Sequence, residues 1–246
     1  MVLALLAAPA ARADFKAFAH VYPYFTQPEG GKEVEIWNGI ETGDLSHPGT
    51  TTLLDERAEI EYGLTDHWDL SFYWVFHQAP EAPIALDSYQ LETRYRFAEK
   101  GLWPVDTELY AEVERPTDLS QPFELETKLI LEKDVHRFLF QGNLIDEEKL
   151  VGGAVFGYRL AFNGGAGYEV RPGLRFGVEL LANHELPFAA PGALPEDTLH
   201  VGPSIALATS RFWFVLTPAF RVLGHDDLED MGSALRLRFI VGIPLD

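Results

Sequence analysis

The residues of this 246-residue chain best suited to chemistry are its eight histidines and its many carboxylates. The histidines form no His-Glu-x-x-His or His-x-His pattern, so their spacing predicts no metal centre. A hydrolase needs a histidine within hydrogen-bond reach of its nucleophile. His200 and Ser204 share a face of one predicted strand, as do Ser71 and His77 of another, but four residues along a strand already span about 13 Å. The sequence therefore predicts no catalytic residue and no cofactor, and a lipid-modifying enzyme built from cross-strand pairs stays a minor alternative.

Two further motifs point only weakly to a ligand. Residues 224–230, Gly-His-Asp-Asp-Leu-Glu-Asp, are acidic enough to attract a divalent cation but lack the ligand spacing of a calcium loop. We interpret them as a solvated loop. The glycines at 164, 165 and 167 precede no Gly-Lys-Ser/Thr sequence, so they do not form a phosphate-binding loop.

The composition narrows the class of protein. Lys and Arg total 19 against 38 Asp and Glu, a formal charge of −19, which argues against nucleic acid as a partner. No run of about 18 apolar residues predicts a membrane-spanning helix. The chain has no cysteine, which is compatible with export. Two classes remain, a soluble β-rich protein and a transmembrane β-barrel, whose hydrophobic residues alternate with polar ones.

The N-terminal residues have the features of an export signal. Val2 to Ala8 is an apolar run, and Ala11-Arg12-Ala13 fits the small-x-small pattern of a cleavage site. No basic residue precedes the apolar run, so the signal peptide of residues 1–13 is expected to be truncated at its start. Residues 14–31 form an aromatic-rich lead-in, and the sequence leaves open whether they pair, line the periplasmic mouth or enter the barrel.

From Lys32 onward the chain repeats one unit, a segment of about ten residues with period-two polarity. Strict alternation of this kind indicates strands with one apolar and one polar face. The sequence predicts twelve strands in a single domain of residues 32–246, at about 33–42, 54–62, 68–76, 89–97, 105–114, 123–132, 137–144, 158–170, 174–180, 199–207, 211–221 and 235–243.

The connections between the predicted strands alternate in length. Alternating short and long loops around an even number of strands are typical of an outer-membrane barrel, whose short turns face the periplasm. Both ends of the barrel domain are then expected on the periplasmic side. The short connections are 64–67, 98–104, 133–135, 171–173 and 209–210, and the long ones are 43–50, 79–87, 116–121, 147–156, 185–197 and 223–231.

Period two fixes the two faces of a strand but not their surroundings. The apolar faces are nearly unbroken over twelve strands, whereas soluble barrels close with about eight to ten. Aromatic residues such as Trp68, Phe97 and Trp103 gather near strand ends, as in interfacial girdles. Several polar-face positions, among them Gly165 and Gly177, are small, which relieves crowding inside a barrel. These features favour an all-β, antiparallel up-and-down transmembrane barrel with outer-membrane lipid as its surroundings.

Two hairpins strengthen this prediction by resemblance. Arg57–Tyr73, with Glu-Ile-Glu-Tyr-Gly-Leu-Thr-Asp-His-Trp-Asp-Leu at its centre, resembles a hairpin of Gram-negative outer-membrane barrels, and residues 167–179 resemble another. The likeness covers roughly residues 32–245 and is greatest to poorly characterised porin-like families. It implies the fold and the outer-membrane location, and it brings no catalytic residue. The chain ends Ile-Pro-Leu-Asp, whereas such barrels often end in an aromatic residue.

A lumen-facing polar surface would sort its charges along the sequence, with acids in the first half and arginines in the second. Closure of the barrel is expected to bring Arg236 and Arg238 near Glu33 and Glu35. One interpretation is a channel for small polar or charged solutes; the alternative is a structural barrel whose lumen is closed by ion pairs. The candidate lumen-lining residues are Glu33, Glu35, Glu59, Glu61, Arg94, Arg96, Glu112, Glu126, Arg159, Arg175, Arg211, Arg236 and Arg238.

Overall fold

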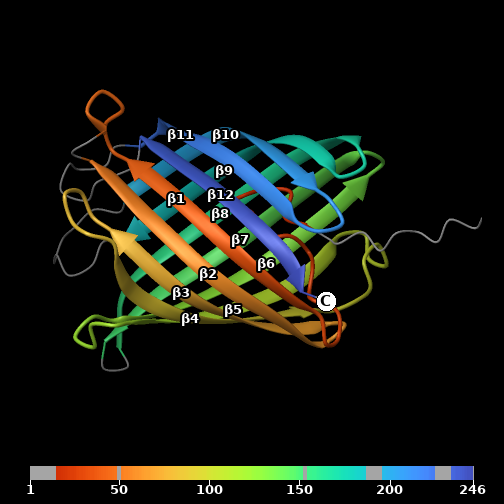
Figure 1. Ribbon diagram of the computed structural model, residues 1–246, viewed down its shortest axis with the longest axis horizontal. Coiled ribbons are helices and arrows are strands. Elements are labelled where there is room, and N and C mark those ends of the chain that lie inside the picture. The colour runs from red at the N-terminus through yellow and green to blue at the C-terminus, as the bar shows by residue number, and fades with distance from the viewer. Residues whose placement is uncertain (1–14, 49–50, 152–153, 187–195, 225–233, 246) are drawn as a thin grey trace, which may run out of the picture.

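The chain folds into a closed antiparallel barrel of twelve strands, which confirms the predicted fold class (Figure 1). The computed structural model describes residues 15–48, 51–151, 154–186, 196–224 and 234–245. The predicted signal peptide, residues 1–13, and most of the acidic loop 224–230 lie outside this range. No helix in the described ranges is long and apolar enough to cross a membrane. The strands are β1 (Lys32–Thr42), β2 (Thr52–Thr65), β3 (Trp68–Gln78), β4 (Ala85–Arg96), β5 (Asp106–Pro116), β6 (Phe123–Val135), β7 (Phe138–Val151), β8 (Ala154–Arg171), β9 (Leu174–Leu186), β10 (Glu196–Ala208), β11 (Trp213–Leu223) and β12 (Leu235–Leu245).

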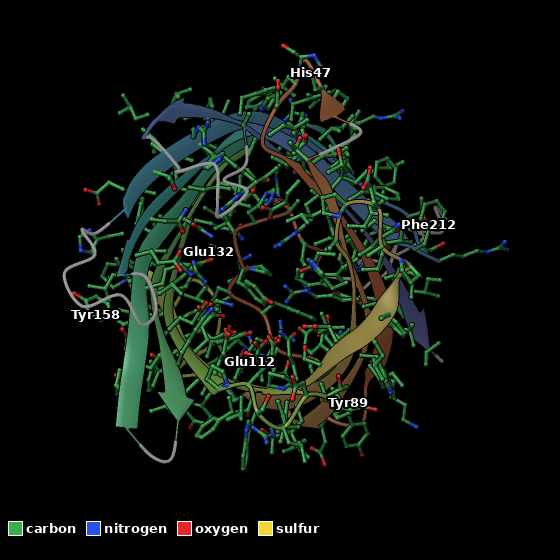
Figure 2. The ribbon with its side chains drawn as sticks, turned by 90° about the vertical axis from the view of Figure 1, so that its left-hand side faces the viewer. His47, Tyr89, Glu112, Glu132, Tyr158 and Phe212 are labelled. Carbon is green, nitrogen blue, oxygen red and sulfur yellow. The ribbon has the colours of Figure 1, made fainter. Side chains whose placement is uncertain are left out.

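The burial of side chains is the reverse of that in a soluble protein. Leu91 and Leu144 are 55% and 50% exposed, whereas Glu59 and Arg94 are 0% and 1% exposed. Figure 2 shows Glu112 and Glu132 pointing into the barrel and Tyr89 lying outside its wall. An apolar outer band around a polar interior is the arrangement that lipid requires of a barrel.

The connections separate by length, so the barrel has two distinct ends. The long ones gather at the left of Figure 1, and we name this the loop end. The short turns and the C-terminus lie at the right, and we name this the turn end. Two of the short turns depend on positive backbone φ angles, 57° at His136 and 77° at Gly173. Glycine adopts such angles without a steric penalty, whereas a side chain makes them costly.

Two predicted connections are wrong. β6 continues to Val135, so the short turn expected at 133–135 lies at 136–137 instead. Residues 147–151 continue β7 and residues 154–156 begin β8, so the long loop expected at 147–156 is two extended strands. Glu147 pairs in register with Arg159, and the Lys149 ammonium lies 3.1 Å from a carboxylate oxygen of Glu124. Successive charged residues obscure the period of two, but these cross-strand ion pairs stabilise the extended conformation.

The barrel closes through β1 and β12, but the predicted register of the charges is wrong. Because the strands run antiparallel, the beginning of β12 meets the end of β1. Arg236 therefore lies opposite Glu41, with 3.4 Å between Nε and a carboxylate oxygen, and Arg238 lies opposite Gly39. Glu33 and Glu35 face Pro244 and Gly242 instead.

Aromatic side chains surround the turn end on the outer surface. Trp68, Phe97 and Phe138 are each between 44% and 50% exposed. Phe97 stacks on Trp103 with 6.0 Å between ring centroids, and a contact of 5.0 Å joins Phe138 to Tyr168. Amphipathic and aromatic rings are favoured where the hydrocarbon core meets water, so this belt marks one membrane boundary.

We expect Leu91→Arg to lower the free energy of unfolding in lipid vesicles by about 2–4 kcal/mol, because Leu91 lies on the lipid-facing surface midway along β4. Urea titration followed by tryptophan fluorescence would measure the change. Leu119→Arg, in the exposed connection after β5, is the matched control and should change stability little. Equal, small effects of both substitutions would contradict a lipid-facing surface.

Candidate functional site

Residues 15–31, which we name the lumen segment, run inside the barrel in its turn-end half (Figures 1 and 2). Of the three placements that the sequence leaves open, the structure therefore shows entry into the lumen. Phe18, Val21 and Tyr24 are at most 1% exposed. The end of the segment, just before β1, is paired with β2 by two backbone hydrogen bonds, in which Gly30 N–H donates to the Gly63 carbonyl and Gly63 N–H donates to that of Gly31.

Glu179 of β9 is the principal anchor of the lumen segment. Its carboxylate accepts hydrogen bonds from the backbone N–H groups of Ala19 and His20, at 2.7 and 2.8 Å, and from the Thr217 hydroxyl. Nδ1 of His20 lies 3.2 Å from the same carboxylate. Burial lowers the pKa of His20, although the hydrogen bond with Glu179 acts in the opposite direction. Together with the Thr217 hydroxyl, the two backbone amides are donors that fix the Glu179 carboxylate against the lumen segment.

Other wall side chains continue this pattern along the segment. Asn143 accepts from Tyr22 N–H at 2.7 Å and donates to the Tyr22 carbonyl at 3.0 Å. Three more backbone groups are paired in the same way: Tyr24 N–H donates to Glu132 at 2.9 Å, Gln27 N–H donates to Asp69 at 2.9 Å, and the Ala17 carbonyl accepts from the Ser204 hydroxyl at 3.3 Å. Buried backbone groups need partners, and here the barrel wall supplies them in place of a neighbouring strand.

Phe18 occupies a recess made by three glycines of β8 and β9. A Cβ atom added at Gly165, Gly177 or Gly167 would lie 2.6, 2.7 or 3.2 Å from its ring. The small lumen-facing residues that the sequence analysis identified therefore make room for this one aromatic ring. Because Phe18 is completely buried, the fit contributes hydrophobic stabilisation as well as shape.

Two lysines pack over an aromatic cluster where the lumen segment meets the wall. Lys16 forms an ion pair with Glu35, and its ammonium lies 4.2 Å from the Trp37 ring centroid. Lys128 lies 3.8 Å above the ring of Tyr22 and 3.7 Å above that of Tyr110. Such cation–π contacts are strongest when they are desolvated, as these are.

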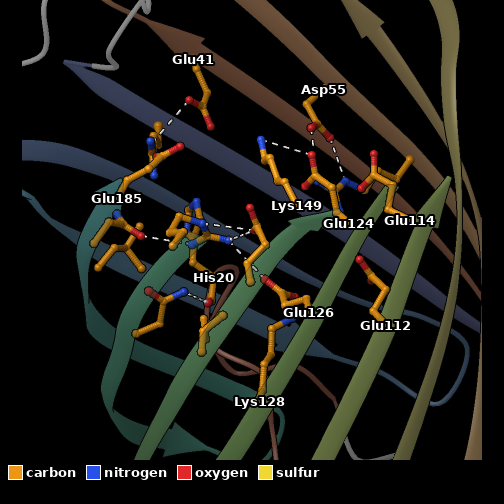
Figure 3. A pocket seen from close by; sticks show the side chains of 18 of the residues that line it. His20, Glu41, Asp55, Glu112, Glu114, Glu124, Glu126, Lys128, Lys149 and Glu185 are labelled. Atoms are coloured by element: carbon orange, nitrogen blue, oxygen red, sulfur yellow. Dashed lines mark hydrogen bonds and ion pairs between the residues drawn. The ribbon is translucent and has the colours of Figure 1, made fainter. Parts of the chain in front are cut away.

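The lumen segment divides the interior into two unequal spaces. Beside it, a cavity lined by Phe15, Lys16 and Arg94 has a volume of about 10 Å³, room for about one water molecule. Towards the loop end lies a cavity of about 1130 Å³, which we name the outer cavity. Its lining extends from Asp118 and Gln121 down to His20 and Tyr22, so the lumen segment forms its floor (Figure 3).

The outer cavity carries opposite charges on different parts of its wall. Neighbouring strands β5 and β6 contribute Glu112, Glu114, Glu124 and Glu126. Strands β2, β1 and β12 contribute Arg57, Arg236 and Arg238, next to Asp55 and Glu41. Several of these charges form ion pairs across the sheet: Arg236 with Glu41, Glu124 with Lys149, and Glu126 with Arg159. Acidic side chains outnumber basic ones in the lining, so the cavity is acidic overall.

The structure separates the predicted lumen residues into two groups and one exception. Those that lie beside the lumen segment at the turn end are Glu33, Glu35, Glu59, Glu61, Arg94, Arg96 and Arg175. Those that line the outer cavity are Glu112, Glu126, Arg159, Arg236 and Arg238. Arg211 lies in the turn between β10 and β11 and is exposed, because β11 begins two residues later than its alternation suggests.

The prediction omitted the residues that hold the lumen segment, above all Glu179, Asn143 and Glu132. Their polar-face positions were visible in the sequence, but no local pattern distinguishes a side chain that binds a backbone from one that faces water. One signal was available. Glu179 lies two residues from Gly177 and in register with Gly165, so its carboxylate is surrounded by residues without side chains and another part of the chain can approach it.

Comparisons with known proteins agree with this architecture. No protein-family model matches the chain, and no curated protein matches it. The COG4313 outer membrane channel from Pseudomonas putida F1 is similar in structure, with a TM-score of 0.66 and 13% identity over 92% of this chain and all of that one. The NanC porin (TM-score 0.58, 10% identity) and the KdgM porin (0.53, 12%) each align with 87% of this chain and 99% of their own. The chain thus has the fold of outer-membrane β-barrels.

We expect Glu179→Ala to release the lumen segment locally, because two buried amides lose a charged acceptor at about 1–3 kcal/mol each. Hydrogen exchange of the Ala19 and His20 amides, measured by mass spectrometry on the folded barrel, should become faster. Glu124→Ala removes a carboxylate that lies towards the loop end and should leave this exchange unchanged. Equal protection in wild type and Glu179→Ala would show that the segment is held by other contacts.

Proposed function

We propose that this protein is an outer-membrane channel for small charged solutes, closed in the present conformation by its lumen segment. The observation that carries the proposal is the outer cavity, whose volume of about 1130 Å³ and opposing charged walls suit a small polar solute. Three proteins with this fold are described as a channel or as porins, the class of function proposed here.

In this proposal the barrel sits in the outer membrane of a Gram-negative bacterium. The apolar outer band contacts lipid, and the turn end, with both termini of the barrel domain, faces the periplasm. A solute enters the outer cavity from the loop end and passes only when the lumen segment shifts. The segment is suited to such a shift because side chains, rather than a continuous strand ladder, hold most of its backbone.

A second candidate function has one specific observation in its favour. The space of about 10 Å³ beside the lumen segment admits no solute larger than water, as expected of a structural barrel with a permanently closed lumen. The two candidates differ in whether the segment leaves its position. Electrical recording distinguishes them directly.

Gly165→Leu is expected to open the channel, because the three described atoms nearest to its added Cβ all belong to the Phe18 ring, at 2.6–2.8 Å. In planar bilayers, wild type should give rare conductance steps and Gly165→Leu frequent ones. The double variant Gly165→Leu/Phe18→Ala restores room for the segment and should return towards wild type. Correctly folded Gly165→Leu that gives no steps, despite faster hydrogen exchange in residues 15–31, would favour the structural barrel.

The acidic lining predicts that the open channel prefers cations. In the Gly165→Leu background, reversal potentials in a KCl gradient should indicate cation selectivity. Adding Glu114→Gln and Glu112→Gln should reduce it, because both carboxylates line the outer cavity. Glu29→Gln, on an exposed residue outside the cavity, is the control and should leave it unchanged. Selectivity for anions would contradict the proposed role of this wall.

A further inference from the structure

We propose that Glu59, Glu61, Glu92 and Ser71 bind one Ca²⁺ ion in the barrel wall beside the lumen segment. The three glutamates each offer a carboxylate oxygen, and these oxygens all lie within 4.8 Å of one another. A Ca²⁺ ion takes oxygen ligands at about 2.3–2.6 Å, so oxygens on opposite sides of it are separated by about this distance. The inference concerns the turn-end half of the barrel and does not depend on the channel function.

The register of three adjacent strands brings these four residues together. Ser71 of β3 lies directly opposite Glu61 of β2 on one side and Glu92 of β4 on the other. Glu59 is two residues from Glu61 and on the same inward face. Directly opposed residues on one face have Cβ atoms about 4.5–5.5 Å apart. The serine hydroxyl is therefore placed between two carboxylates and adds a fourth, neutral oxygen to the group.

Three of the four side chains, those of Glu59, Ser71 and Glu92, have an oxygen without a hydrogen bond to the described chain, whereas both oxygens of Glu61 accept one. Among the described residues, Oγ of Ser71 and Oε1 of Glu59 have no hydrogen-bond partner, although the two residues are only 2% and 0% exposed. Oε1 of Glu92 likewise has no hydrogen bond and has only an ion pair with Arg94 Nε at 3.2 Å. Buried polar atoms without partners are costly, and a bound ion would satisfy all three.

The other oxygens of the group are fixed by donors that orient them. Trp37 Nε1 donates to Oε2 of Glu59 at 3.0 Å, and the Tyr73 hydroxyl donates to Oε2 of Glu92 at 2.5 Å. Glu61 accepts from Arg94 and, at 2.8 Å, from Gln27 of the lumen segment. Outer hydrogen bonds of this kind hold ligands in position at metal sites.

The excess of buried carboxylates over basic side chains at this place also favours a bound cation. Six carboxylates lie together here, and each is at most 4% exposed: Glu33, Glu35, Glu59, Glu61, Asp69 and Glu92. The basic side chains in ion-pair contact with them, in the described part of the chain, are Lys16 and Arg94. A divalent ion offsets part of this excess, which would otherwise be a large desolvation cost.

A neighbouring group of glutamates is less suited to an ion. Glu33, Glu35 and Glu61 also bring oxygens within 4.8 Å of one another. Lys16 already pairs with Glu35, and Trp213 Nε1 donates to Glu33 at 3.0 Å. None of the fully buried oxygens without a hydrogen bond in the described structure belongs to Glu33 or Glu35, whereas three belong to Glu59, Ser71 and Glu92, so the ion is assigned to the group with Ser71.

The test is calcium binding to the full-length protein, folded in detergent and stripped of metal with a chelator. Isothermal titration with CaCl₂ should give about one ion per chain for wild type. Glu59→Gln should weaken binding by about tenfold or more, since it replaces a charged ligand with a neutral amide. Ser71→Ala keeps every charge and should still weaken binding measurably. Glu124→Gln also removes a lumen carboxylate, but one outside the group, and should bind as wild type does.

A second measurement keeps the test decisive if Glu59→Gln folds poorly. Ca²⁺ should raise the thermal midpoint of wild type and of Glu124→Gln by more than that of Ser71→Ala. Absence of a stoichiometric calcium ion in wild type would overturn the proposal, because protonated carboxyl groups would then account for the charge. Equal binding by wild type and Ser71→Ala would also overturn it, since binding would then reflect the acidic lumen as a whole.

Discussion

The pairing of β1 with β12 is the constraint on which the rest of this structure depends. Lipid offers no hydrogen-bond partners, so a sheet in a membrane must close on itself to pair every strand. Closure fixes which face of each strand is inside. Because polar and apolar residues alternate along each strand, the charged side chains lie inside the barrel and the hydrophobic ones lie outside. The lumen segment, residues 15–31, has no β partner along most of its length. It can be buried because the polar interior supplies hydrogen-bond partners for its backbone.

The polar interior has different roles in its two halves. At the turn end, carboxylates and amides of the wall take the place of a neighbouring strand for the lumen segment, as Glu179 and Asn143 show. At the loop end, similar side chains face the outer cavity instead. The acidic side chains of the inner face are thus divided between those that hold the lumen segment and those that line the outer cavity.

Most of the fold could be predicted from the sequence, because period two is a local property of consecutive residues. The errors arise where local order gives no information. Residues 147–151 carry successive charges whose extended conformation depends on partners such as Arg159 across the sheet. The partner of Arg236 depends on the antiparallel register of the closing strands, which makes it Glu41. Contacts of the lumen segment join residues more than a hundred positions apart, so no window of sequence contains them.

This division also determines which predicted lumen residues can act on a solute. Glu35, Glu61 and Arg94 are buried and engaged by fixed partners, so they hold the structure in place and do not line the outer cavity. Glu112 and Glu126, with Arg57 and Arg238 on other strands, line the outer cavity and set the field there. In the proposed channel, selectivity therefore resides in the loop-end half and closure in the turn-end half. A substitution in one half can change the first property while leaving the second intact.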